Sequence, residues 1–149
     1  MTQFVQGMRV YWEDTDAGGV VFYANYLKFF ERARTEWLRH LGFSQEAMRV
    51  EQGLMFVVSA TSLKYLAPAK LDDWLDVSVN LQGTGRSTMV LFQQVHAGGR
   101  LLCEGEIRIA CVDAQSFKPT RIAAPIAQKL AQKLAPLVHA AASPHSDSH

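Results

Sequence analysis

Residues 13–44, EDTDAGGVVFYANYLKFFERARTEWLRHLGFS, decide the fold. Three carboxylates open this stretch, two glycines follow at positions 18 and 19, and a helical pattern runs from about Tyr23 to Leu41. Apolar residues recur in that pattern at helical spacing: Tyr26, Phe29, Phe30, Ala33, Trp37, Leu38 and Leu41. Gly42 is typical of the position just beyond a helix end. So wide an aromatic stripe predicts a helix buried against a sheet.

Strand-forming segments lie on both sides of this helix. Residues 8–14, MRVYWED, alternate well enough to predict a first strand. After a short helix expected from Ser44 to about Glu51, the β-rich segments are 54–66, 75–81, 88–95 and 101–112. Tight glycine turns, GTGRS and HAGGR, separate the last three and predict an antiparallel meander. The order predicts an α+β fold with the helix on one face of a five-stranded sheet.

The C-terminal part of the chain predicts one more helix and then a tail. Residues 123–135 form an amphipathic pattern with Ile126, Leu130 and Leu134 on one side. A chain of 149 residues without a long linker predicts one domain, which we assign to residues 1–136. The small and polar residues of 137–149 predict a disordered tail.

The composition predicts a soluble globular protein of the cytoplasm. The chain is 48% hydrophobic and 19% charged, with a net charge of +1. So small a net charge produces only a weak electrostatic field, which favours neither nucleic acid nor an anionic membrane as a partner. The N-terminus lacks the pattern of a secretory signal. Residues 19–30, the most apolar window, contain Asn25 and Lys28, so no membrane span is expected.

The cysteines predict no disulfide within the chain. Cys103 and Cys111 lie eight residues apart in one expected strand, which separates them by about 27 Å. A disulfide needs Cα atoms within about 7 Å. We therefore expect two buried thiols in a reducing compartment.

Acidic residues just before the long helix suggest a chemical site. A helix N-terminus presents free N–H groups and partial positive charge, which can hold the oxyanion formed when a thioester is attacked. A nearby carboxylate can attack the carbonyl or deprotonate a water. The same pattern also fits a helix cap or a solvated turn. A metal site is not predicted, because no histidine lies in this stretch.

The ordered motifs favour the chemical interpretation. Residues 13–44 closely resemble the Tol-Pal-associated acyl-CoA thioesterases, which belong to the 4-hydroxybenzoyl-CoA thioesterase branch of the hotdog superfamily. The similarity continues through FVVSATSLKYLAPAKLDD at 56–73, GRSTMVLFQQ at 85–94 and CVD at 111–113, and covers roughly residues 8–122.

This resemblance implies a hotdog fold, with one antiparallel sheet wrapped round the long helix. Such domains pair edge to edge, with each active site between two subunits, so a homodimer or homotetramer is expected. The implied activity is hydrolysis of an acyl-CoA to a free carboxylic acid and CoA without a cofactor. The second aspartate of D-x-D, here Asp16, matches the catalytic carboxylate, as nucleophile or general base. The backbone N–H of Tyr23 matches the group that polarises the thioester carbonyl.

One departure from the family concerns Tyr23, because close members often carry histidine there. The change removes an imidazole that could act in acid–base chemistry or orient the substrate. The backbone N–H remains, so the oxyanion can still be stabilised. The effect on rate and on acyl preference is open.

The resemblance also implies binding residues. Arg86, Ser87 and Thr88 match a segment that contacts the nucleotide end of CoA. Further candidates are Lys64, Lys70 and Arg121, although single surface lysines and arginines are usually solvated charges. Val57, Val58 and Ser59 would line the acyl pocket of the neighbouring subunit, although core packing explains the valines equally well.

Glu31 is a secondary catalytic candidate, because hotdog dehydratases use an acidic residue on this helix. Otherwise we expect Glu31 to pair with Arg34 on the polar face, at i, i+3.

Two other functions remain open from the sequence. A hotdog dehydratase or hydratase needs a histidine near the catalytic carboxylate, and none lies near Tyr23. A non-catalytic module that binds acyl carrier protein or an envelope complex is the main alternative. The acyl chain length and the choice between dimer and tetramer are not predicted.

Overall fold

A computed structural model describes the backbone from residue 3 to residue 142 and the side chains as far as residue 134. Its elements in chain order are β1 (Phe4–Arg9), the 3-10 helix η1 (Trp12–Asp14), α1 (Asn25–His40), α2 (Gln45–Gln52), β2 (Leu54–Tyr65), β3 (Trp74–Thr84), β4 (Thr88–Ala97), β5 (Arg100–Asp113) and α3 (Ala124–Ala142).

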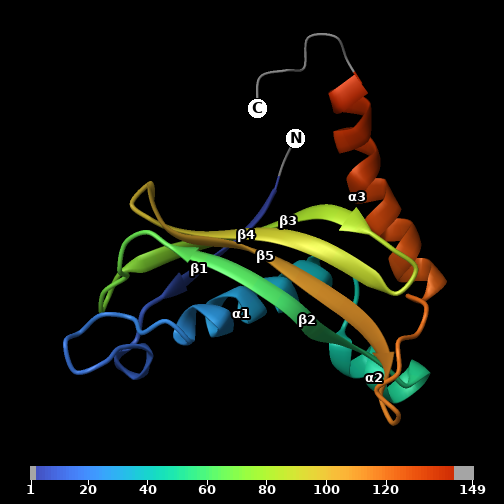
Figure 1. Ribbon diagram of the computed structural model, residues 1–149, viewed down its shortest axis with the longest axis horizontal. Coiled ribbons are helices and arrows are strands. Elements are labelled where there is room, and N and C mark those ends of the chain that lie inside the picture. The colour runs from blue at the N-terminus through green and yellow to red at the C-terminus, as the bar shows by residue number, and fades with distance from the viewer. Residues whose placement is uncertain (1–2, 143–149) are drawn as a thin grey trace.

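The five strands form one antiparallel sheet in the order β1-β3-β4-β5-β2 (Figure 1). Strands β3, β4 and β5 form the predicted meander. The β4–β5 hairpin turns at Gly98 and Gly99, whose φ values of 57° and 80° suit a tight two-residue turn. β1 joins β3 at one edge although the whole of α1 and β2 separates them in the sequence. β2 forms the other edge.

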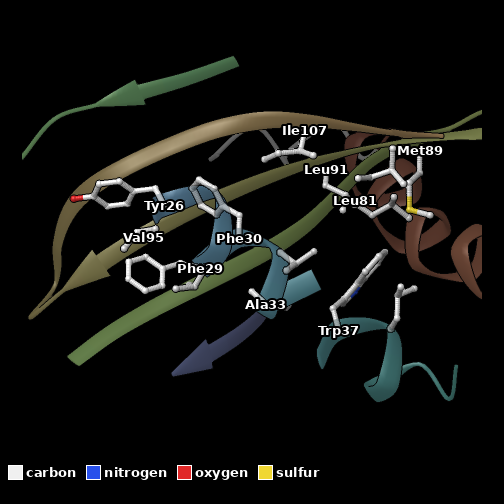
Figure 2. Packing of buried hydrophobic residues seen from close by; sticks show 14 of the residues in the cluster. Tyr26, Phe29, Phe30, Ala33, Trp37, Leu81, Met89, Leu91, Val95 and Ile107 are labelled. Atoms are coloured by element: carbon white, nitrogen blue, oxygen red, sulfur yellow. The ribbon is translucent and has the colours of Figure 1, made fainter. Parts of the chain in front are cut away.

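Helix α1 lies across one face of the sheet, and its apolar stripe makes the centre of the core. Figure 2 shows the side chains of this stripe between α1 and the sheet, together with those of β3, β4 and β5. Every apolar position predicted for this helix, from Tyr26 to Leu41, is buried. The alternating residues of β3 meet them: Leu75, Val77, Val79 and Leu81. This sheet wrapped round a central helix is the hotdog fold that the sequence predicts.

The helix ends follow the local sequence signals. Gly42, at a φ of 97°, follows α1, where a left-handed backbone suits glycine best. Ser44 caps α2, because its hydroxyl accepts a hydrogen bond of 3.3 Å from the Ala47 N–H.

The prediction for the first strand was wrong in its position. β1 covers Phe4–Arg9 instead of 8–14, and residues 12–14 form a 3-10 turn. The reason lies in the partner strand: Arg9 pairs with Trp74, where β3 begins, so the chain beyond Arg9 has no strand to extend along. The Asp14 carboxylate then closes the turn by accepting a bond of 2.8 Å from the Tyr11 N–H.

Helix α3 begins where the sequence predicts it and buries Ile126 and Leu130. It runs to Ala142, past the domain boundary that we expected at residue 136. The rest of the expected tail, 143–149, lies outside the described residues. Among the helices described, none is long and apolar enough to cross a membrane.

Both cysteines are free and buried, as predicted. Burial raises the pKa of both thiols, and that of Cys103 reaches about 12. The thiols are therefore protonated at neutral pH and serve as core residues.

Candidate active site

Asp16 lies in a tight turn before α1. Its backbone N–H donates to the Val20 carbonyl at 2.9 Å, and its carbonyl accepts from the Gly19 N–H at 3.0 Å. The carboxylate takes part through Oδ1, which accepts from the Gly18 N–H at 2.8 Å and from the Val20 N–H at 3.4 Å. Within the described residues Oδ2 has no hydrogen-bond partner, and the side chain is exposed. One oxygen thus fixes the carboxylate, and the other faces outward.

This turn is fastened to a second segment of the chain. The Val21 N–H donates to the Ala69 carbonyl at 2.9 Å, and the Leu71 N–H donates to the Gly19 carbonyl at 3.0 Å. Gly19 has a φ of 78°, which explains a glycine at the sharpest point of the turn. Asp16 is therefore held in a rigid loop although its side chain is exposed.

The backbone just before α1 leaves a donor open, although the N–H groups of Asn25, Tyr26 and Leu27 each donate to the carbonyl three residues earlier. Ala24 occupies the N-cap position and has no capping side chain, and the first turn carries no acidic residue. In the part of the chain that the structure describes, the N–H of Tyr23 has no hydrogen-bond acceptor. A free N–H at an uncapped helix start can hold negative charge, because the partial positive charge of the helix dipole lies there.

A cavity of about 250 Å³ lies at Tyr23, and three tyrosines contribute to its lining. The Tyr23 ring lies 4.8 Å from the ring of Tyr65, and the Tyr65 hydroxyl donates to the Tyr23 carbonyl at 3.4 Å. The lining residues are Val21, Tyr23, Tyr26, Tyr65, Leu66, Ala67 and Pro68. Burial raises the pKa of the Tyr65 hydroxyl, so at neutral pH it remains a donor.

A second cavity, of about 160 Å³, brings together other predicted residues. It lies between α1 and β2 and is lined by Glu31, Val57 and Val58 together with core residues such as Met89 and Leu91. Ser59 is not part of its lining. It lies at a bulge between Val58 and Ala60, where its hydroxyl donates to the Arg108 carbonyl at 3.3 Å.

The expected ion pair between Glu31 and Arg34 does not form. Arg34 lines the same cavity but turns toward the core, where its Nη1 donates to Oε1 of Gln93 at 3.0 Å. Glu31 is exposed and has no salt bridge among the described residues. Arg34 lies at the border of the buried stripe, so its long side chain can reach a polar acceptor beneath the helix.

The segment of Arg86, Ser87 and Thr88 lies at the other end of the sheet. β3 separates it from the Asp16 loop: with 11 residues this strand spans roughly 35 Å. Figure 1 shows the blue loop before α1 on the left and the β3–β4 turn on the right beside α3. The Arg86 carbonyl accepts from the Ile122 N–H at 3.0 Å, which brings the chain at Arg121 close to Arg86. Lys70 instead neighbours the Asp16 loop, because it pairs with Val20.

The predicted residues therefore fall into separate groups within one chain. Asp16, Tyr23 and Lys70 gather at the start of α1, and Arg86 and Arg121 lie at the far end of the sheet. Among the described residues no three His, Cys, Asp or Glu side chains lie close enough to hold a metal ion.

Residues 10–134 match the sequence model of a family described as the thioesterase-like superfamily. The chain belongs to this superfamily. It is 46% identical over 119 residues to the acyl-CoA thioester hydrolase YbgC of Escherichia coli O6:H1, covering 79% of this chain and 88% of the relative. The resemblance stated from the sequence motifs is thus confirmed, and so is the prediction of an enzyme.

Solved structures agree with the thioesterase-like fold. A probable thioesterase from Bartonella henselae has a TM-score of 0.77 at 33% identity, over 82% of this chain and all 100% of that one. A DHNA-CoA thioesterase from Staphylococcus aureus has a TM-score of 0.84 at 24% identity, over 93% of this chain and 95% of that one, and shows likeness of fold alone.

Some residues at the candidate site of this thioesterase-like chain were not predicted. Tyr65 contacts Tyr23 across 42 positions of sequence, and the only local signal was an aromatic residue at a strand end. Asn25 opens α1, and its side chain donates to Asp14 at 2.9 Å. Both contacts depend on how α1 docks against other segments, which no spacing within the sequence reveals.

Proposed function

We propose that the chain hydrolyses acyl-CoA thioesters, with the Asp16 carboxylate as the reacting group and the Tyr23 N–H as the oxyanion donor. The observation that carries this proposal is the state of these two groups. Asp16 has one oxygen held by its turn and one without a partner in the described part of the chain. Seven residues later, an uncapped helix start carries an N–H without an acceptor among the described residues.

The chemistry follows from those groups. Either Asp16 attacks the thioester carbon and forms a mixed anhydride that water then hydrolyses, or it removes the proton of a water that attacks directly. Both routes break the carbon–sulfur bond, and CoA leaves as a thiolate that takes up a proton. In both, negative charge builds on the carbonyl oxygen, where one backbone donor typically accelerates the reaction by about 10²–10³-fold.

The proposal includes a second subunit in each site. One chain alone has its Arg86 segment roughly 35 Å along β3 from the Asp16 loop. β2 is an edge strand of the sheet. One side of it pairs with β5, and no described strand pairs with the other side, which can therefore pair with another copy of the chain. In an edge-to-edge homodimer, Val57, Val58 and Ser59 of one subunit would line the acyl pocket of the other. Arg86, Ser87 and Thr88 would hold the nucleotide end of CoA.

Two smaller assignments belong to the same proposal. The reaction is assigned to the cytoplasm, where free buried thiols such as Cys103 and Cys111 stay reduced. Glu31 remains a secondary candidate, since it borders the cavity that Val57 and Val58 line.

The direct test replaces Asp16 by asparagine, which keeps the shape but removes the base and nucleophile. Wild type and Asp16→Asn are assayed on a panel of short, long and aromatic acyl-CoA esters. We expect kcat to fall by about 10²–10⁴-fold on every ester that the wild type hydrolyses. The matched control is Asp113→Asn, whose carboxylate also accepts backbone bonds in an exposed turn, from Gln115 and Ser116. An Asp16→Asn variant with wild-type turnover would refute the assignment.

Mixed dimers test whether two subunits share the site. We expect Asp16→Asn and Arg86→Ala chains each to have little activity alone, the first for want of the carboxylate and the second for want of the nucleotide contact. A mixed dimer has one site with both defects and one with neither, so mixing should restore activity toward a quarter of the wild-type value per chain after random exchange. Activity no greater than the sum of the separate variants would argue for a site within one chain.

A further inference from the structure

We infer that a buried hydrogen bond between Asp14 and Asn25 positions Asp16 and the Tyr23 N–H for the reaction. This inference rests on the proposed function, because it assigns a role to residues that support the two reacting groups. Asp14 and Asn25 are positioning residues: they are 2% and 1% exposed and so have no contact with substrate.

The bond joins the two segments on which the reacting groups lie. Asn25 Nδ2 donates to Asp14 Oδ1 at 2.9 Å, and Asp14 Oδ2 accepts from the Tyr11 N–H at 2.8 Å. Asp14 stands two residues before Asp16, and Asn25 stands two residues after Tyr23. The contact therefore closes the base of a 12-residue loop that contains both groups.

The backbone of Asn25, which its side chain ties to Asp14, also sets the direction of the Tyr23 N–H. Its own backbone N–H donates to the Phe22 carbonyl at 3.0 Å. The Phe22 carbonyl and the Tyr23 N–H belong to one planar trans peptide unit, in which they point in opposite directions. A helix start that holds this carbonyl therefore turns the Tyr23 N–H outward, away from the bond.

The burial of both side chains indicates that their contact has a specific role. A carboxylate removed from water is costly unless its oxygens are hydrogen-bonded, and here both oxygens are. The Asn25 amide donates to Asp14, and its own Oδ1 is buried without a partner among the described residues. A polar side chain in the core whose one hydrogen bond goes to Asp14 fits a role in fixing that contact.

The test exchanges the two side chains, because the pair is nearly isosteric. Asn25→Asp breaks the donor–acceptor match, because it sets two carboxylates against each other without a donor. Asp14→Asn keeps a match, because Asn25 can turn its amide so that its oxygen, which has no partner among the described residues, accepts from the new amide N–H. The double variant Asp14→Asn/Asn25→Asp restores one donor facing one acceptor, and the amide oxygen introduced at position 14 can still accept from the Tyr11 N–H. Each variant is assayed for kcat and KM on the best ester of the panel, well below its melting temperature.

We expect Asn25→Asp to lower kcat by about 10²-fold with KM changed less than threefold, the loss expected from a displacement near 1 Å. Asp14→Asn should lower kcat by no more than about tenfold, because its amide can still bond to Asn25. The double variant should return kcat to within about tenfold of wild type. Asp113→Asn again serves as the control for loss of a carboxylate that accepts backbone bonds. A single variant that does not fold is replaced by Asn25→Ser, which keeps a donor at the helix start and should show an intermediate loss of kcat.

Several results would overturn the inference. These are an Asn25→Asp variant with wild-type kcat, a loss expressed only in KM, and a double variant that does not fold or stays as slow as Asn25→Asp. Each would exclude positioning by this pair. Asp16→Asn separates this failure from that of the proposed function. If it retains wild-type turnover, the reacting group is wrong; if it is inactive while Asn25→Asp is not, only the positioning role is wrong.

Discussion

Replacing Gln93 by methionine tests the polar contact at the centre of the core. Gln93 is 0% exposed, and its side chain makes three hydrogen bonds, two to α1 and one to the neighbouring strand β3. Oε1 accepts from Arg34 at 3.0 Å, and Nε2 donates to the carbonyls of Phe30 and Ser78 at 3.2 Å each. Methionine keeps the length and volume of glutamine but removes all three bonds.

The size of the effect follows from these contacts. A hydrogen bond to a charged group contributes about 1.5–3 kcal/mol, and each bond between neutral groups contributes about 0.5–1.5 kcal/mol. We therefore expect Gln93→Met to lower the free energy of unfolding by about 4 kcal/mol. In a domain of this size that corresponds to a melting temperature lower by about 10 °C.

A double-mutant cycle isolates the Arg34 contact. Much of the loss comes from leaving the Arg34 guanidinium without its acceptor in a half-buried position. Replacing both partners by apolar groups is far less costly than replacing one. Arg34→Met/Gln93→Met should therefore be more stable than the sum of the single effects predicts, by about 2 kcal/mol.

The assay is urea unfolding followed by tryptophan fluorescence, at one protein concentration for all variants so that association does not alter the comparison. The chain has three tryptophans, and Trp37 of α1 is buried in the core between this helix and the sheet. A Gln93→Met variant within about 0.5 kcal/mol of wild type, or strict additivity in the cycle, would refute the role of this contact.

Two further predictions concern titratable core residues. Burial raises the pKa of the Cys103 thiol to about 12. Ellman's reagent at pH 8 should therefore leave Cys103 and Cys111 unmodified in the folded chain and react with both after denaturation. Fast reaction in the folded state would contradict their burial. Burial also raises the pKa of Tyr26 above 10.0, so the unfolded phenol ionises first and stability falls as the pH rises above about 10. Urea midpoints at about pH 9 and pH 10.5 should therefore differ more in wild type than in Tyr26→Phe, and equal falls would show that Tyr26 makes no such contribution.

The sequence predicted those features that depend on neighbouring residues. The helical spacing in residues 23–41 marked the face of α1 that is buried, and alternation in residues 75–81 marked the core face of β3. Glycines marked the turns that need positive φ. Burying an apolar face stabilises one local conformation over another, so its period is visible within one segment. The motifs around Asp16 likewise indicated the family before any contact was known.

The tertiary structure decided which distant residues meet. Arg34 belongs by its spacing with the polar face of α1, yet it reaches Gln93, 59 positions away. Tyr65 meets Tyr23 across 42 positions, and β1 ends at Arg9 because its partner β3 begins at Trp74. These contacts depend on the register of the sheet and on how α1 docks against it. A side chain's own neighbours in the sequence carry no information about either, so only the folded chain brings these partners together.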